Sequence, residues 1–256
     1  MSDIIHKLEK YEERLQGYFL NKRDKNPELE IYLLDHDLSD SELIELEACL
    51  LEDFSETHLF RYQYMLCYLV IITQVAFDFD GIRFWDKLIE KFPVPEYHNY
   101  WEGYSNGKAR SRIYSFYAEF QTSYGGVVPL GDWAERKRYI CHPVTHAILP
   151  KNLQLKLFKF INERLDYIES EHFETPETLG REISNSYLAY NTQFDTLFDH
   201  PILLGSLVFD ISEQKPNTDE GKKQLIVFSS NTLSKIKENL DDDTERDIKI
   251  RSSQAK

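Results

Sequence analysis

Basic and aromatic side chains are concentrated in one stretch of the chain, between residues 97 and 139. Basic side chains neutralise phosphates or carboxylates, and exposed aromatic rings stack on nucleobases. Arg110 and Arg112 also lie near the start of a helix expected over 109–124, where the helix dipole favours anions. The stretch therefore predicts a surface for an anionic partner, either a protein or a nucleic acid. Its candidate binding residues are Lys108, Arg110, Arg112, Arg136, Lys137 and Arg138.

The aromatic residues of this stretch also allow a second interpretation. Four rings recur at the helical spacing i, i+3, i+6 and i+10, namely Tyr114, Tyr117, Phe120 and Tyr124. We therefore expect most of these rings to belong to the core, with the basic residues as a solvated rim around them. The two interpretations differ in how exposed the rings should be.

The charge of the chain is distributed unevenly. The 256 residues include 30 basic and 44 acidic side chains, so the formal net charge is −14. Residues 1–60 hold 6 basic and 16 acidic side chains, net −10, and residues 166–200 hold 1 and 8, net −7. Between them, residues 97–165 hold 10 basic and 5 acidic side chains, net +5. The acidic total is therefore compatible with an anionic partner that binds one local surface.

Two aspartates after an apolar run could carry out phosphoryl chemistry. The segment Val75-Ala76-Phe77-Asp78-Phe79-Asp80-Gly81 resembles the first motif of haloacid dehalogenase-like phosphohydrolases, and Ile226-Val227-Phe228-Ser229 resembles their second. The resemblance implies a strand that presents Asp78 as nucleophile, with Asp80 as general acid/base and Mg²⁺ neutralising the phosphate. Ile82 stands where the family usually has Thr. A phosphohydrolase is therefore the alternative to a binding protein.

Cys141, His142 and His146 bring three metal-ligating side chains into six residues. Pro143 disfavours the helical conformation at His142, so we expect a helix that ends before Pro143 and two imidazoles that need not share a face. No second Cys/His pair with zinc spacing follows, and we expect no metal and no other cofactor. The three cysteines, Cys49, Cys67 and Cys141, show no paired spacing and are typical of reduced thiols in a cytosol.

Helical periodicity extends over most of the chain. Ser39 with Glu42 three residues later forms a capping-box pattern, and Gly125 and Gly126 can end a helix. The run 58–77 predicts a buried core helix, although its β-branched residues at 70–73 also allow a strand. Further helices are expected at 3–20, 82–92, 109–124, 132–141, 152–170, 177–198 and 232–239.

The last part of the chain has a different pattern. Ile202–Ile211 and Gln224–Ser229 look like strands, which allows a small β-hairpin or strand pair. We therefore predict a mainly α, multi-helix globular domain over 1–200. A smaller α/β segment over 201–256 follows, with a charged tail that we expect to link to a further domain.

The most favoured function is a non-catalytic helical binding module of a larger bacterial assembly. It would bind a partner protein or nucleic acid through the basic and aromatic middle, and a role in a mobile-element or antiviral defence system is consistent with it. A purely structural or self-associating domain is a further alternative. Met1–Lys7 shows no secretory pattern, and no apolar run reaches the roughly 18–20 residues of a membrane helix. We therefore expect a cytoplasmic protein without a membrane partner.

Overall fold

The computed structural model is helical throughout the regions it describes, apart from connecting segments and one isolated parallel bridge between Ile31 and Gly126. The prediction of a mainly α fold is thus confirmed. No helix within these regions combines the length and apolar character needed to cross a membrane. The described residues are 2–79, 83–95, 100–101, 108–130, 134, 138–151, 153–154, 157–158, 161, 173–187 and 196–238.

Residue contacts divide the chain into two compact units. Unit 1 comprises Met1–Pro129 and Ala134–Ile148, and unit 2 comprises Leu130–Trp133 and Leu149–Lys256. The division falls earlier than the change of sequence pattern at residue 200, because helices on both sides of residue 200 pack together in unit 2.

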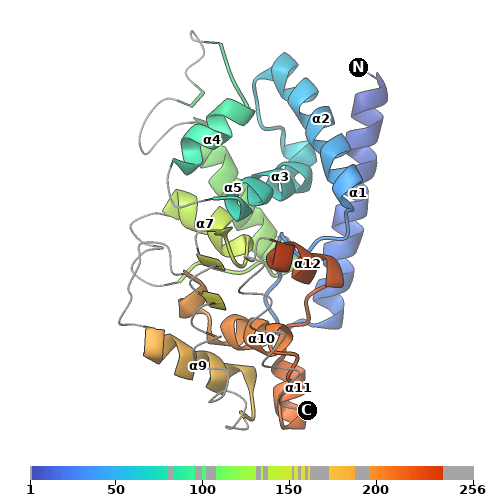
Figure 1. Cartoon of the computed structure of the whole chain (residues 1–256). Helices are drawn as coiled ribbons and strands as arrows, with labels where there is room; N and C mark the ends of the chain where they lie inside the picture. The colour runs from blue at the N-terminus through green and yellow to red at the C-terminus, as the bar shows by residue number, and fades with distance from the viewer. Residues whose placement is uncertain are drawn as a thin grey trace. The chain divides into compact units, whose positions relative to one another are not determined.

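Unit 1 is built around one buried helix, α3 (Met65–Phe77), which contacts α1, α2, α4, α5 and α7 (Figure 1). Every residue of α3 except Gln74 is buried, as expected for a helix that is apolar on all sides. The β-branched run at 70–73 is therefore helical, and the predicted core helix is confirmed. The surrounding elements are α1 (Ser2–Lys25), α2 (Asp40–Thr57), η1 (Tyr62–Tyr64), α4 (Phe84–Lys91), α5 (Lys108–Tyr124) and α7 (Arg138–His146).

The N-terminus of α3 is capped by a residue from another helix. Tyr64, the residue before α3, makes no capping hydrogen bond with its side chain. Instead the carboxylate of Glu12 in α1, which is 6% exposed, accepts the backbone N–H groups of Leu66 and Cys67, each at 3.0 Å. The first N–H groups of a helix have no partner within it, so Glu12 satisfies two buried donors and ties α1 to the core.

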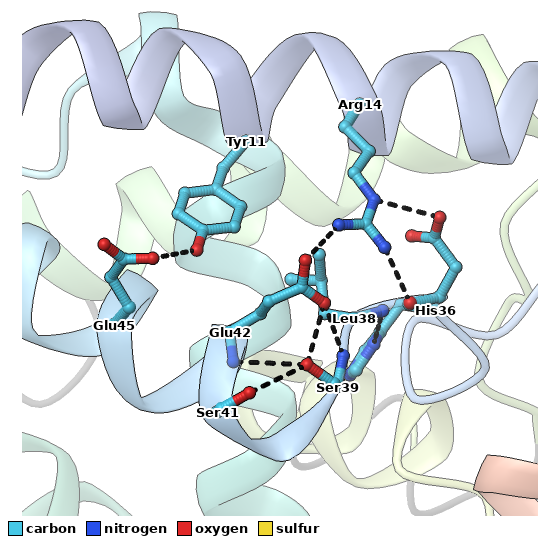
Figure 2. A network of polar contacts seen from close by, with 9 residues as sticks. Tyr11, Arg14, His36, Leu38, Ser39, Ser41, Glu42 and Glu45 are labelled. Atoms are coloured by element: carbon cyan, nitrogen blue, oxygen red, sulfur yellow. Dashed lines mark hydrogen bonds and ion pairs between the residues drawn. The ribbon is translucent and has the colours of Figure 1, made fainter.

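The start of α2 shows the predicted capping box. Ser39 Oγ accepts the N–H of Glu42 at 3.4 Å, and the Glu42 carboxylate accepts the N–H of Ser39 at 2.8 Å. Figure 2 shows that Arg14 of α1 reaches the same carboxylate, while Tyr11 donates to Glu45 at 2.6 Å. The first turns of α2 are thus held both by their own cap and by α1.

Gly125 ends α5 as the sequence predicts. Its φ of 75° is in the left-handed region, and its N–H donates to the Gln121 carbonyl at 3.1 Å. Beyond it, the backbone of Gly125 and Val127 pairs with Ile31 in the buried segment that connects α1 to α2.

The prediction of a strand over 202–211 is wrong, because this segment is helix α10 (Pro201–Ile211). Residues 225–229 have no regular secondary structure. A ten-residue apolar run fits a buried strand or a buried helix equally well. Here Pro201 occupies the first turn of the helix, and a neighbouring helix covers the run. The other elements of unit 2 are α9 (Pro176–Tyr187), η3 (Thr196–Asp199), α11 (Asp219–Gln224) and α12 (Ser230–Glu238).

Two glycines let α9 and α10 approach each other closely (Figure 1). Both helices begin with the pattern Pro-x-x-Leu-Gly, at Pro176 and at Pro201. A Cβ on Gly180 would lie 1.8 Å from the carbonyl oxygen of Pro201, and a Cβ on Gly205 would lie 1.8 Å from that of Pro176. The contact is therefore reciprocal, with the fifth residue of each helix against the first residue of the other.

Candidate functional site

The basic residues predicted to bind an anion do not all share one face. Lys108 and Arg112 are exposed and four residues apart on α5, so they lie on the same side of the helix. Arg110 points to another side, where its guanidinium lies 4.9 Å from the centroid of the Trp85 ring on α4. Arg138 is the first residue of α7, and Arg136 and Lys137 lie outside the described residues.

Most aromatic rings of the middle region are buried. Phe116, Tyr117 and Phe120 have no exposed surface, and Tyr124 is 8% exposed. Tyr114 is half-buried. The interpretation that most of these rings belong to the core is thus confirmed. The described rings are therefore not a platform for stacking nucleobases, while Tyr97, Tyr104 and Trp133 lie outside the described residues.

One exposed aromatic residue that the sequence analysis missed lies beside Arg112. Tyr62 in η1 is 53% exposed, and its ring packs edge-on against Phe116 of α5 at 5.8 Å between centroids. Partial burial and the Glu119 carboxylate raise the pKa of Tyr62, and the neighbouring Arg112 opposes this shift. The sequence pattern does not single out Tyr62. The apolar run 58–77 reads as one continuous helix, whereas Tyr62 belongs to a separate three-residue turn before α3.

The two aspartates of the phosphohydrolase motif are not presented by a strand. Val75–Phe77 forms the last turn of α3, and Asp78 is the exposed residue that follows it. Asp80 lies outside the described residues, and 226–229 is not a strand either. The strand context that the resemblance implies is therefore wrong at the described positions. Asp78 lies instead at a helix C-terminus, where the dipole disfavours a bound phosphate.

The Cys141–His146 segment is a continuous part of α7, with Pro143 inside it. The expected helix end before Pro143 is wrong, because the helix continues through the proline to His146, and Cys141 and Val144, on either side of the proline, are buried. His142 and His146 therefore share a face, and both contact the Tyr117 ring, at 5.6 and 5.1 Å between centroids.

The side chains of this segment are packed in the core of unit 1. Burial raises the pKa of Cys141 to about 12, so its thiol is neutral. His146 Nδ1 accepts the backbone N–H of Leu33 at 3.4 Å. Within the described part of the chain, no three His, Cys, Asp or Glu side chains come together in a way that could hold a metal ion.

His142 makes the stability of unit 1 sensitive to acid. The side chain is 9% exposed, and burial lowers its pKa to about 4. The unfolded chain binds this proton near pH 6.5, so the contribution of neutral His142 is complete above that pH and is lost as the pH falls towards 4. We expect this residue alone to account for about 3 kcal/mol of lost unfolding free energy. Urea unfolding of wild type and His142→Gln, at several pH values between these limits, measures the difference.

The variant should lose less stability on acidification than the wild type, whatever other groups titrate in both proteins. Equal pH dependence of the two proteins would show that His142 is protonated without cost in the fold.

Comparison of the chain with models of protein families, with curated proteins and with solved structures found no match. The structure describes a helical protein whose unit 1 buries most of its described aromatic rings and leaves Tyr62, Lys108 and Arg112 exposed.

Proposed function

We propose that this protein is a non-catalytic helical binding module that binds an acidic segment of a partner protein. The binding residues are Lys108 and Arg112 on α5, together with Tyr62, and we call these three residues the basic–aromatic surface. The observation that carries the proposal is that α5 is anchored in the core while two of its cations stay exposed. Its inner side holds Ile113, Phe116 and Phe120 in the core, whereas Lys108 and Arg112 are exposed. A helix fixed in this way holds the backbone of both cations in place before a partner binds, so binding has to order only their side chains.

An acidic protein segment fits this surface better than a nucleic acid does. Nucleic-acid binding without sequence preference relies on several exposed rings and a basic groove. Among the described residues, Tyr62 is the exposed aromatic ring at this surface, so a single ring is available there to stack on a base. Tyr and Arg are also the residues that protein interfaces favour.

The test uses a fluorescein-labelled peptide rich in Asp and Glu, with DNA and RNA oligonucleotides of equal net charge for comparison. We expect the peptide to bind at about 50 mM salt, and the double variant Lys108→Ala/Arg112→Ala to bind it about tenfold more weakly. The matched control is Lys10→Ala/Lys25→Ala, which removes two exposed cations from α1. This control should bind the peptide like the wild type.

Two results would contradict the proposal. One is an equal loss of peptide affinity in both double variants, which would mean that only net charge matters. The other is tighter binding of an oligonucleotide than of the peptide at the same salt, which would make nucleic acid the partner.

A further inference from the structure

A pocket of about 380 Å³ opens between the first turn of α1 and the last turns of α2. It does not involve the basic–aromatic surface. Ile4 and Ile5 of α1 line one part of it, and Glu52, Asp53 and Glu56 of α2 line another. A pocket at the lower end of the ligand-binding range fits one or two side chains of a bound segment.

The innermost charges of this pocket compensate each other. Asp53 is buried, and its carboxylate accepts from Arg61 Nη1 at 2.6 Å and from the Tyr68 hydroxyl at 3.3 Å. The Arg61 guanidinium also lies 5.1 Å from the centroid of the Tyr64 ring. This pair is therefore part of the fold, and it leaves the glutamates as the uncompensated charges of the pocket.

Glu52 and Glu56 lack the ion pairs that other acidic residues of α2 make with neighbouring elements. Glu42 pairs with Arg14, Glu45 with Lys7 and Glu47 with Lys91. Among the residues that the structure describes, the carboxylates of Glu52 and Glu56 have neither an ion pair nor a hydrogen bond. Both residues are exposed.

The position of these two glutamates is electrostatically unfavourable in the isolated chain. They lie four residues apart, where like charges repel on a helix surface. They also lie in the last turns of α2, at the negative end of the helix dipole, and the last turn contains no basic residue. A cation at the mouth of the pocket would relieve both effects.

We propose that this pocket binds a lysine or arginine side chain of a basic, amphipathic segment of a partner protein. The aliphatic stem of the side chain packs on Ile4 and Ile5, and its charged end lies between the carboxylates of Glu52 and Glu56. Long cationic side chains have this combination of apolar stem and charged end. The net charge of −10 over residues 1–60 attracts such a segment from a distance.

The test is a labelled, amidated peptide with two lysines on one side of a leucine-rich helix, and the same peptide with both lysines replaced by glutamine. We expect the lysine peptide to bind the wild type and to bind Glu52→Gln/Glu56→Gln about tenfold more weakly. The matched control is Glu9→Gln/Glu13→Gln on α1, where two exposed glutamates have the same spacing and the affinity should not change. Without peptide, Glu52→Gln/Glu56→Gln should melt at the same temperature as the wild type or higher, because a repulsion is removed.

Several outcomes would overturn the proposal. Binding of the glutamine peptide as tightly as the lysine peptide would remove the role of the cation, and an equal loss in both double variants would remove the role of the pocket. A lower melting temperature of Glu52→Gln/Glu56→Gln would give these carboxylates a structural role instead. Displacement of the peptide by an equimolar alkyl diamine would assign the pocket to a small amine. Self-association by sedimentation that Glu52→Gln/Glu56→Gln abolishes would assign it to a second copy of the chain.

Discussion

Replacing Gly180 by alanine should destabilise unit 2 by about 3 kcal/mol, although alanine is the better helix former by about 1 kcal/mol. The new Cβ would lie 1.8 Å from the carbonyl oxygen of Pro201, which is backbone and cannot rotate away. The two helices must therefore separate, and the packing along α10 is lost with the contact. Gly205→Ala meets the carbonyl of Pro176 at the same distance and should have an effect of similar size.

Gly17 provides the control for these variants. It lies on the exposed side of α1, and a Cβ there would meet nothing within 4 Å. Gly17→Ala should therefore stabilise the protein by about 0.5–1 kcal/mol, the opposite sign from Gly180→Ala. Urea unfolding measures the free energies, and hydrogen exchange over 176–211 locates the loss in unit 2. Destabilisation by all three variants, or by none, would contradict the close packing of α9 on α10.

The double variant Gly180→Ala/Gly205→Ala tests whether the two contacts act together. Either Cβ alone forces the helices apart, so the second substitution meets a gap that already exists. We expect the double variant to lose clearly less unfolding free energy than the sum of the single losses. Strict additivity would mean that each glycine contributes through its own helix rather than through the shared contact.

Replacing Glu12 by alanine should destabilise unit 1 by about 3 kcal/mol, because two buried N–H groups of α3 lose their acceptor. Glu12→Gln should lose less, since the amide keeps one oxygen that can accept. Glu13→Ala is the control, because Glu13 is the exposed neighbour of Glu12 and its removal should change the free energy by less than about 0.5 kcal/mol. Thermal or urea unfolding followed by circular dichroism is sufficient for all three.

A small effect of Glu12→Ala, comparable to that of Glu13→Ala, would show that water or another group replaces the carboxylate at the start of α3. The cap would then not be what holds α1 against the core. Equal losses for Glu12→Ala and Glu12→Gln would show that the charge, rather than the acceptor oxygens, is what α3 requires.

The sequence located the helix α5 and the cations on it, but not the side of the helix to which each cationic side chain points. The helical spacing of Lys108 and Arg112 was available from the sequence, yet the stacking of Arg110 on Trp85 depends on α4, which is distant along the chain. Tyr62 was missed because its exposure depends on which other elements cover the side chain, and the sequence alone does not give this packing. The pocket beside Glu52 and Glu56 was missed for the same reason, since its two sides come from α1 and α2.

The sequence by itself determined the features that depend on near neighbours. The capping box at Ser39, the glycine that ends α5 and the periodic apolar face of α1 all involve residues within about four positions of each other. Only the tertiary structure decided the features that depend on distant segments. Residues 202–211 form a helix that packs against α9, and Glu12 caps a helix 54 residues away. Burial and capping of this kind follow from the packing of the whole unit, and no short stretch of sequence contains them.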